Sequence, residues 1–97
     1  MKVLALITPT AGTTIDMMKP HLADEARQSW QLYKRDFIRE LYLIGEGRPG
    51  AVAILESPSL REAEEAMSCL PLVTARLASV DCIALAPFGS WEALFAR

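Results

Sequence analysis

Residues 36–73, DFIRELYLIGEGRPGAVAILESPSLREAEEAMSCLPLV, decide the fold of this chain. The segment predicts, in order, a strand over 36–44, a glycine- and proline-rich turn over 45–50, a strand over 51–56 and a helix from Ser59 to about Cys69. So short a link joins antiparallel neighbours, because a parallel connection needs about a dozen residues or more. Ser59 followed by Glu62 is a capping box, which fixes where the helix starts.

The flanking sequence extends this unit to a single domain over residues 1–97. It predicts a strand over 2–8, a helix over about 16–34, a strand over 79–87 and a short helical turn after Gly89. The order βαββαβ is that of a ferredoxin-like α+β fold. Right-handed crossovers then place both helices on one face of a four-stranded antiparallel sheet.

The strands are apolar on both of their faces. Strict alternation along 36–44 would place Phe37, Arg39, Leu41 and Leu43 on one side and Ile38, Glu40, Tyr42 and Ile44 on the other. Two helices cover only one face, and a monomer rarely leaves several hundred Å² of apolar surface in water. We therefore expect a homodimer or higher homo-oligomer in which two sheets face each other. Further candidates to reach the neighbouring subunit are Trp91, Leu94 and Phe95.

The first helix is expected to bury a stripe made of Leu22, Ala26, Ser29 or Trp30, and Tyr33, which recur at spacings of three and four. Its charged and amide residues are expected to face away from the sheet: Asp24, Glu25, Arg27, Gln28, Gln31 and Lys34.

Composition excludes several classes of function. The 97 residues carry a net charge of −2 and no basic run, which argues against binding to nucleic acid or to an anionic membrane surface. The apolar run over 3–7 is too short for a signal peptide, and no stretch approaches the roughly 20 apolar residues of a spanning helix. Cys69 and Cys82 are read as small core residues of a cytoplasmic protein.

The segments ESPSLREAEEAMSCLPLV and PFGSWEALF resemble the muconolactone isomerase-like branch of the dimeric α+β barrel proteins. The resemblance rests on the strand pattern, on the P-S-x-x-E-A helix start and on the L-P-L exit of that helix. It implies a ferredoxin-like subunit that dimerises into a barrel. It also implies action on small cyclic or aromatic-derived acids without metal or organic cofactor.

Polar residues that interrupt the strands are candidates for a small-molecule site, since a charge in an apolar strand needs a partner or a wet cavity. Glu40 and Tyr42 share a face and would act as proton acceptor and enolate-stabilising donor. Arg39 or Arg76 would hold a substrate carboxylate. The alternative is an edge strand whose charges discourage aggregation, or an Arg–Glu pair across the dimer.

Two further residues complete the candidate set. His21 is the only histidine and lies near the start of the first helix, where it would serve as a general base; a solvated helix-start residue is the alternative. A histidine near this helix matters in YciI-like members of the superfamily. Trp30 is a candidate pocket wall. One histidine and scattered acids predict no metal site.

We therefore expect a cofactor-independent small-molecule enzyme, an isomerase that moves a proton on a cyclic acid or lactone. Two alternatives stay open at this point. One is a cofactor-free oxygenase or dehydrochlorinase of the same superfamily. The other is a non-catalytic dimeric binding or assembly protein.

Overall fold

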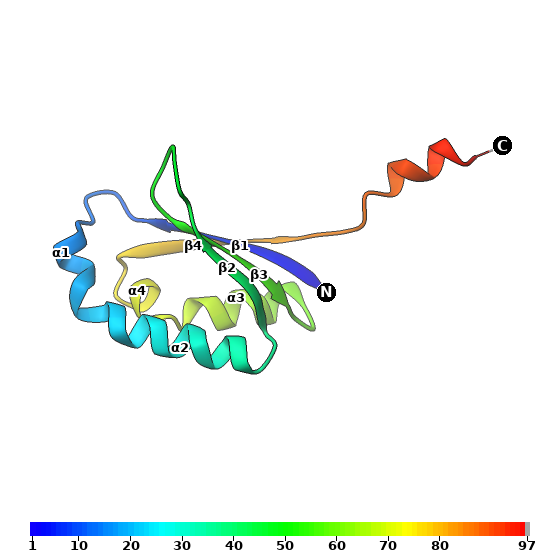
Figure 1. The fold of residues 1–97 in the computed structure, drawn as a ribbon. Helices are drawn as coiled ribbons and strands as arrows, with labels where there is room; N and C mark the ends of the chain where they lie inside the picture. The colour runs from blue at the N-terminus through cyan, green and yellow to red at the C-terminus, as the bar shows by residue number, and fades with distance from the viewer. Residues whose placement is uncertain (97) are drawn as a thin grey trace.

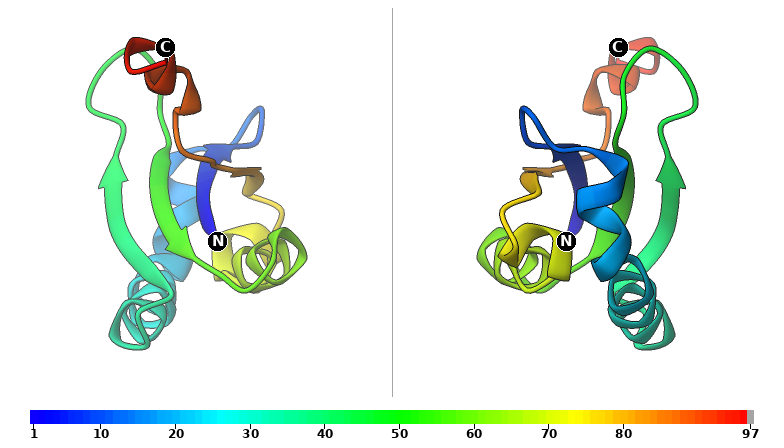
Figure 2. Two further views of the ribbon diagram at one scale, coloured as in Figure 1. Left: turned by 90° about the vertical axis from the view of Figure 1, so that its right-hand side faces the viewer. Right: turned by 90° about the vertical axis from the view of Figure 1, so that its left-hand side faces the viewer.

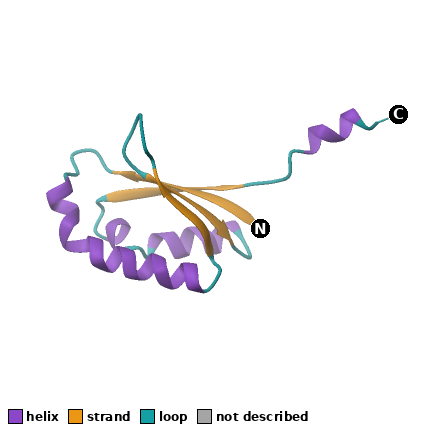
Figure 3. Ribbon diagram, viewed as in Figure 1, coloured by secondary structure: helices purple, strands orange, loops and turns teal. Residues whose placement is uncertain are grey.

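In the computed structural model, which describes residues 1–96, the chain forms a four-stranded antiparallel sheet covered on one face by helices (Figures 1 and 3). The elements are β1 (Lys2–Pro9), α1 (Ile15–Met18), η1 (Lys19–His21), α2 (Leu22–Lys34), β2 (Ile38–Leu43), β3 (Ala51–Glu56), α3 (Leu60–Ser68), α4 (Pro71–Thr74), β4 (Ala78–Ala84) and η2 (Gly89–Leu94). The strand order is β2-β3-β1-β4, so β2 and β4 are the edges. The expected ferredoxin-like α+β architecture is confirmed.

The core lies between the sheet and the helices. Helix α2 packs on β2, and α3 packs on β1 and β4. Inward residues of the two central strands alternate strictly, and the buried set is Val3, Ala5, Ile7, Leu32, Ile38, Ala53, Leu55, Ala63, Met67, Leu70 and Ala78. The intervening residues of β1 and β3, Leu4, Leu6, Val52 and Ile54, face the other side of the sheet and are only half-buried. This second side, the open face, is therefore apolar as expected.

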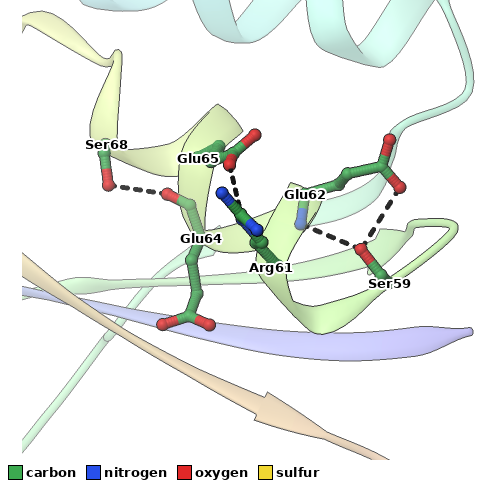
Figure 4. A network of polar contacts seen from close by, with 6 residues as sticks. All are labelled: Ser59, Arg61, Glu62, Glu64, Glu65 and Ser68. Carbon is green, nitrogen blue, oxygen red and sulfur yellow. Dashed lines mark hydrogen bonds and ion pairs between the residues drawn. The ribbon is translucent and has the colours of Figure 1, made fainter.

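Helix α3 begins where its capping residues predict. Ser59 has extended backbone angles and its Oγ accepts a hydrogen bond of 3.1 Å from the backbone N of Glu62. The Glu62 carboxylate accepts a hydrogen bond of 3.2 Å from the Ser59 hydroxyl, not from the Ser59 backbone N–H (Figure 4). The capping box is therefore only half formed. An Arg61–Glu65 pair one turn apart lies on the solvent side of the same helix (Figure 4).

The first helix is interrupted, which corrects the expectation of one helix over 16–34. Thr14 caps the short α1 through its hydroxyl, and the chain then passes through the three-residue η1 before α2 begins at Leu22. Pro20 lies inside η1, where its missing N–H costs no α-helical hydrogen bond. Helix α4 is an addition to the expected elements, and β4 ends at Ala84, earlier than the expected strand over 79–87.

A β-bulge in β2 overturns the strict alternation expected over 36–44. Ile38 pairs with Leu55 and Glu40 pairs with Ile54, so Arg39 is an extra residue with no opposite partner. The bulge places Ile38 on the helix side together with Leu41 and Leu43. Glu40 and Tyr42 remain on the open face, so that the strand serves two different surfaces.

Residues 86–96 form an arm that leaves the body. Leu85 still donates a backbone hydrogen bond of 2.9 Å to Lys2. Beyond it the chain extends away from the sheet and ends in the short η2 (Figures 1 and 2). The molecule is consequently elongated, with extents of 59 × 31 × 19 Å. We call residues 86–96 the C-terminal arm.

Candidate functional site

A cavity of about 280 Å³ lies between α2, α3 and the sheet. Its walls are almost wholly apolar, and the residues that line it are Ile7, Leu22, Glu25, Ser29, Ile38, Leu41, Tyr42, Leu43, Ala51, Ala53, Met67, Leu70 and Leu72. Its volume is close to the lower end of small-ligand pockets, at about 300 Å³, which suits a molecule built on a single ring. We call it the α2 cavity.

Glu25 is the one carboxylate on the wall of the α2 cavity. Its Oε1 accepts a hydrogen bond of 2.9 Å from the backbone N of Leu72, 47 residues away along the chain. That N–H belongs to the first turn of α4, where no intrahelical acceptor exists, and Leu70, the residue at the N-cap, supplies no side-chain bond. The contact holds the half-buried carboxylate beside an apolar space.

The position of Glu25 corrects the expected face of α2. Glu25 and Ser29 are half-buried and Leu32 is buried, at spacings of four and three, so these residues face the sheet. Much of the expected inner stripe lies on the flank, since Ala26, Trp30 and Tyr33 are exposed. Leu22, 45% exposed, borders the α2 cavity, and Ser29 faces inward as expected. The apolar side chains of α2 therefore do not mark the face that packs on the sheet, because several of them line a second apolar surface outside the core.

That second surface is a groove beside the edge strand. It is lined by Ala26, Ser29, Trp30, Tyr33, Ile38 and Leu41, and it shares Ser29, Ile38 and Leu41 with the α2 cavity. Trp30 and Tyr33 stack with ring centroids 5.4 Å apart. The expected role of Trp30 as a pocket wall therefore corresponds to this groove, which we call the Trp30 groove, and it continues into the cavity.

Glu40 and Tyr42 are brought together, but on the open face. The Tyr42 hydroxyl donates a hydrogen bond of 2.8 Å to Glu40 Oε1, and both side chains are exposed. This bond favours the neutral phenol, and with the nearby negative charge of Glu40 it raises the pKa of Tyr42. Tyr42 also borders the α2 cavity, whereas Glu40 belongs to a polar hollow with Lys2, Arg39, Ile54 and Glu56.

The remaining candidates are dispersed. His21 is the half-buried residue at the N-cap of α2 and makes no side-chain capping bond there. Arg76 is exposed just after α4 and has φ of 62°, the left-handed conformation that glycine adopts most readily. Neither residue is among those that line the α2 cavity. Arg39 is the bulged residue and lies beside Glu40.

Cysteine and metal chemistry find little support within residues 1–96. Both cysteines are free. Cys69 is exposed, which corrects its expected place in the core, whereas Cys82 is half-buried against the core. Burial, followed by the nearby charges of Glu64 and Asp81, raises the pKa of the Cys82 thiol, so it stays protonated and unreactive at neutral pH. In this part of the chain no three His, Cys, Asp or Glu residues are arranged to hold a metal ion, and no helix has the length and apolarity needed to cross a membrane.

No protein-family model and no curated protein matches this chain. Solved structures that are similar to it include two enzymes. One is 5-chloro-2-hydroxyhydroquinone dehydrochlorinase from Burkholderia phenoliruptrix AC1100, in complex with 2,5-dihydroxybenzoquinone: the TM-score is 0.72 and the identity 17%, over 89% of this chain and 94% of that one. The other is muconolactone isomerase, with a TM-score of 0.70 and 18% identity, over 91% of this chain and 93% of that one. At these identities the likeness establishes the fold, and it confirms the expected resemblance at that level.

Proposed function

We propose that this protein is a cofactor-independent enzyme that moves a proton next to a carbonyl group on a small cyclic acid or lactone. Glu25 carries the proposal, because it is a carboxylate held by the Leu72 backbone N–H at the wall of an apolar cavity. In the proposed reaction Glu25 takes the proton from the carbon beside the carbonyl and returns it to another carbon of the resulting enolate. Such positioned groups typically contribute 10²–10⁴-fold to rate.

The cavity suits this chemistry in size and polarity. Its volume of about 280 Å³ admits one ring, and its apolar walls would pack against the carbon skeleton of a small cyclic substrate. Ser29 is the second polar side chain on α2 at the wall, with its hydroxyl bonded to the Ala26 carbonyl at 3.0 Å. Tyr42 borders the cavity from β2, but its hydroxyl is bonded to Glu40 on the open face and is not positioned to stabilise an enolate oxygen inside the cavity.

Dehydrochlorination is the second candidate function, and the neighbouring fold of a dehydrochlorinase favours it. Removal of the same proton, followed by departure of chloride from the adjacent carbon, would use Glu25 in the same role. An isomerase must return the proton, whereas a dehydrochlorinase keeps it with the base until solvent removes it.

The experiment uses solvent exchange, because the exchange of a proton is detectable whatever product the reaction forms. The protein is incubated in D₂O with a panel of lactones, cyclic enones and chlorinated hydroxyquinones, and loss of the proton beside the carbonyl is followed by NMR. Glu25→Gln should lower the exchange rate 10²–10⁴-fold. The amide oxygen still accepts from Leu72, so the thermal midpoint should stay near that of the wild type.

Glu65→Gln is the matched control, since Glu65 lies on the solvent side of α3 and pairs with Arg61. It should leave exchange unchanged. Equal rates in Glu25→Gln and the wild type would show that the base lies elsewhere, and Glu40→Gln, Tyr42→Phe and His21→Ala would then identify it. If no compound on the panel is exchanged or bound, the non-catalytic binding module becomes the better interpretation.

We also propose that the protein is a homodimer that buries the open faces of two sheets. The support is the row of half-buried apolar side chains there, Leu4, Leu6, Val52 and Ile54. Ile54→Asp should convert the dimer to monomer or aggregate in light scattering, because it places a charge in the centre of the joined faces. A wild-type protein that is monomeric at micromolar concentration would refute this proposal.

A further inference from the structure

The wall of the α2 cavity offers a ligand very few polar groups. Among its lining residues, Glu25, Ser29 and Tyr42 have polar side chains and all the others are apolar. The Tyr42 hydroxyl donates to Glu40 on the open face, so it is turned away from the cavity. The polar groups that a ligand can meet are therefore the Glu25 carboxylate and the Ser29 hydroxyl.

These two groups lie side by side on α2. They are four residues apart in one helix, which places their Cβ atoms about 5–6 Å from each other on the same face. Glu25 Oε1 accepts from the Leu72 backbone N at 2.9 Å, which leaves Oε2 to meet a ligand. The Ser29 hydroxyl donates to the Ala26 carbonyl at 3.0 Å and can rotate to donate to a ligand instead. The wall thus presents one acceptor beside one donor.

The wall also presents no positive charge. Among residues 1–96, no lysine, arginine or histidine lines the α2 cavity. The two arginines expected to hold a substrate carboxylate lie elsewhere: Arg39 is the bulged residue beside Glu40, and Arg76 is exposed just after α4. A carboxylate in the cavity would therefore meet no cation and would share the space with Glu25.

The size of the cavity makes this repulsion decisive. A sphere of 280 Å³ is about 8 Å across, so a bound carboxylate would lie within about 8 Å of the Glu25 charge. At that distance and at an effective dielectric constant of about 20, the repulsion lowers the affinity for an anion by more than about 10-fold. Loss of the hydration of an unpaired carboxylate lowers it further.

A cationic ligand is also poorly matched to the cavity. An ammonium group carries three N–H donors, and each of them needs an acceptor once it is buried. The walls offer the oxygens of Glu25 and Ser29, and apolar side chains surround these two residues. A carbonyl oxygen, in contrast, needs a donor, and the Ser29 hydroxyl provides it.

We propose that the α2 cavity binds an uncharged ring that carries a carbonyl group, that Ser29 donates to the carbonyl oxygen and that Glu25 excludes anions. This inference rests on the proposed function for the role of the cavity as substrate site. It narrows the substrate class from cyclic acids or lactones to lactones and other uncharged ring carbonyl compounds. A carbonyl oxygen bound at Ser29 leaves the neighbouring carbon on the side of Glu25, where its proton is removed.

Three small aromatic probes test the charge preference in the full chain. Acetophenone and benzoate have the same number of non-hydrogen atoms and nearly the same shape, but only benzoate is charged; benzylamine is the cationic counterpart. Each probe is titrated at neutral pH and followed through the methyl resonances of Ile7, Met67 and Leu70, which line the cavity. Acetophenone should shift these resonances with a Kd at least about 10-fold lower than that of benzoate.

Substitutions on α2 separate the roles of the two polar groups. Glu25→Gln should strengthen benzoate binding at least about 5-fold and leave the Kd of acetophenone within about 2-fold, because it removes a charge but keeps the shape. Glu65→Gln removes the same charge from the solvent side of α3 and should change neither value. Ser29→Ala should weaken acetophenone binding by about 3–10-fold, the effect of one hydrogen bond.

The proposal is overturned if benzoate or benzylamine binds the wild type as tightly as acetophenone does. It is equally overturned if acetophenone at millimolar concentration leaves the cavity resonances unshifted, or if Glu25→Gln does not change the preference between acetophenone and benzoate. These measurements need no turnover, whereas the catalytic proposal depends on proton exchange. A Glu25→Gln variant that gains benzoate binding but keeps the wild-type exchange rate would refute the catalytic role alone.

Discussion

Replacing Gly50 with alanine is expected to destabilise the protein strongly, because this glycine is both conformationally special and closely packed. Gly50 begins the return of the β2–β3 hairpin with φ of 142°, and its carbonyl accepts a hydrogen bond of 2.8 Å from Ile44. A Cβ added there would lie 2.6 Å from the Ile7 carbonyl oxygen and 3.2 Å from Ile44 Cδ1. The first of these contacts is with backbone, which cannot rotate away.

The expected cost has two parts. Holding a side-chain-bearing residue at this φ costs about 1–3 kcal/mol, and forcing an extra carbon into packed structure costs roughly another 1–3 kcal/mol. Because the strands can relax in part, we expect a total loss of about 2–4 kcal/mol in the free energy of unfolding. For a domain of this size, about 4–8 °C per kcal/mol converts that loss into a fall of roughly 8–32 °C in the thermal midpoint.

Two other glycines of the same turn distinguish the conformational cost from the steric cost. Gly47 has φ of 92° but no atom within 4 Å of the added carbon, so Gly47→Ala tests conformation alone and should cost about 1 kcal/mol. Gly45 has neither a positive φ nor a close neighbour, and Gly45→Ala should change stability by no more than about 0.5 kcal/mol.

Urea unfolding at one fixed protomer concentration is the appropriate assay, since dimerisation would make the midpoint depend on concentration. The order of loss should be Gly50, then Gly47, then Gly45. If Gly50→Ala costs no more than Gly47→Ala, the close approach to Ile7 is not rigid and the steric part of the reasoning is wrong. Because Ile7 also lines the α2 cavity, Gly50→Ala should weaken ligand binding as well.

Three smaller changes follow from the same geometry. Arg76→Gly should raise the free energy of unfolding by about 0.5–1 kcal/mol, because glycine adopts the left-handed conformation at φ 62° without strain. Arg76→Ala keeps the strain and is the control. A lower free energy of unfolding in urea for Arg76→Gly would instead reveal a stabilising contact of the arginine. Ser59→Ala should cost about 1 kcal/mol through loss of the cap on α3, and an unchanged thermal midpoint would contradict that. Glu40→Gln should lower the pKa of Tyr42 toward its ordinary value of 10.0, as measured by ultraviolet titration. The bond between them stabilises the folded state below about pH 10 and its contribution is lost as the pH rises through the folded pKa, so no change in the titration would show that Glu40 does not act on the phenol.

Local signals predict most of the fold. Ser59 and Glu62 fix the start of α3 because a cap is an interaction between residues three apart. The hairpin over 45–50 and the alternation of β1 and β3 likewise depend on neighbours in sequence. The arrangement of strands then follows from general rules of handedness and connection.

The site is less accessible to sequence reasoning, because the contact that defines it is distant. The sequence pattern puts Glu25 on the outer face of α2, since a carboxylate beside Asp24 resembles a solvated helix surface. Its partner is the backbone N of Leu72, and nothing local reveals a tertiary contact of that kind. One signal is present: the L-P-L exit creates a helix start with no capping side chain of its own, which requires an acceptor from elsewhere.

The bulge at Arg39 has a consequence for how this strand can change in evolution. Without that residue the strand would read Ile38, Glu40, Leu41, Tyr42 and Leu43, a perfect inward–outward alternation that keeps every observed strand pairing. A deletion at position 39 should therefore be tolerated. Deletion of Leu41 would instead turn the strand residues before or after the gap to the opposite face of the sheet. Sequence alignments of distant relatives should accordingly place a single-residue gap at Arg39, and forcing an ungapped match there would misalign the strand by one residue.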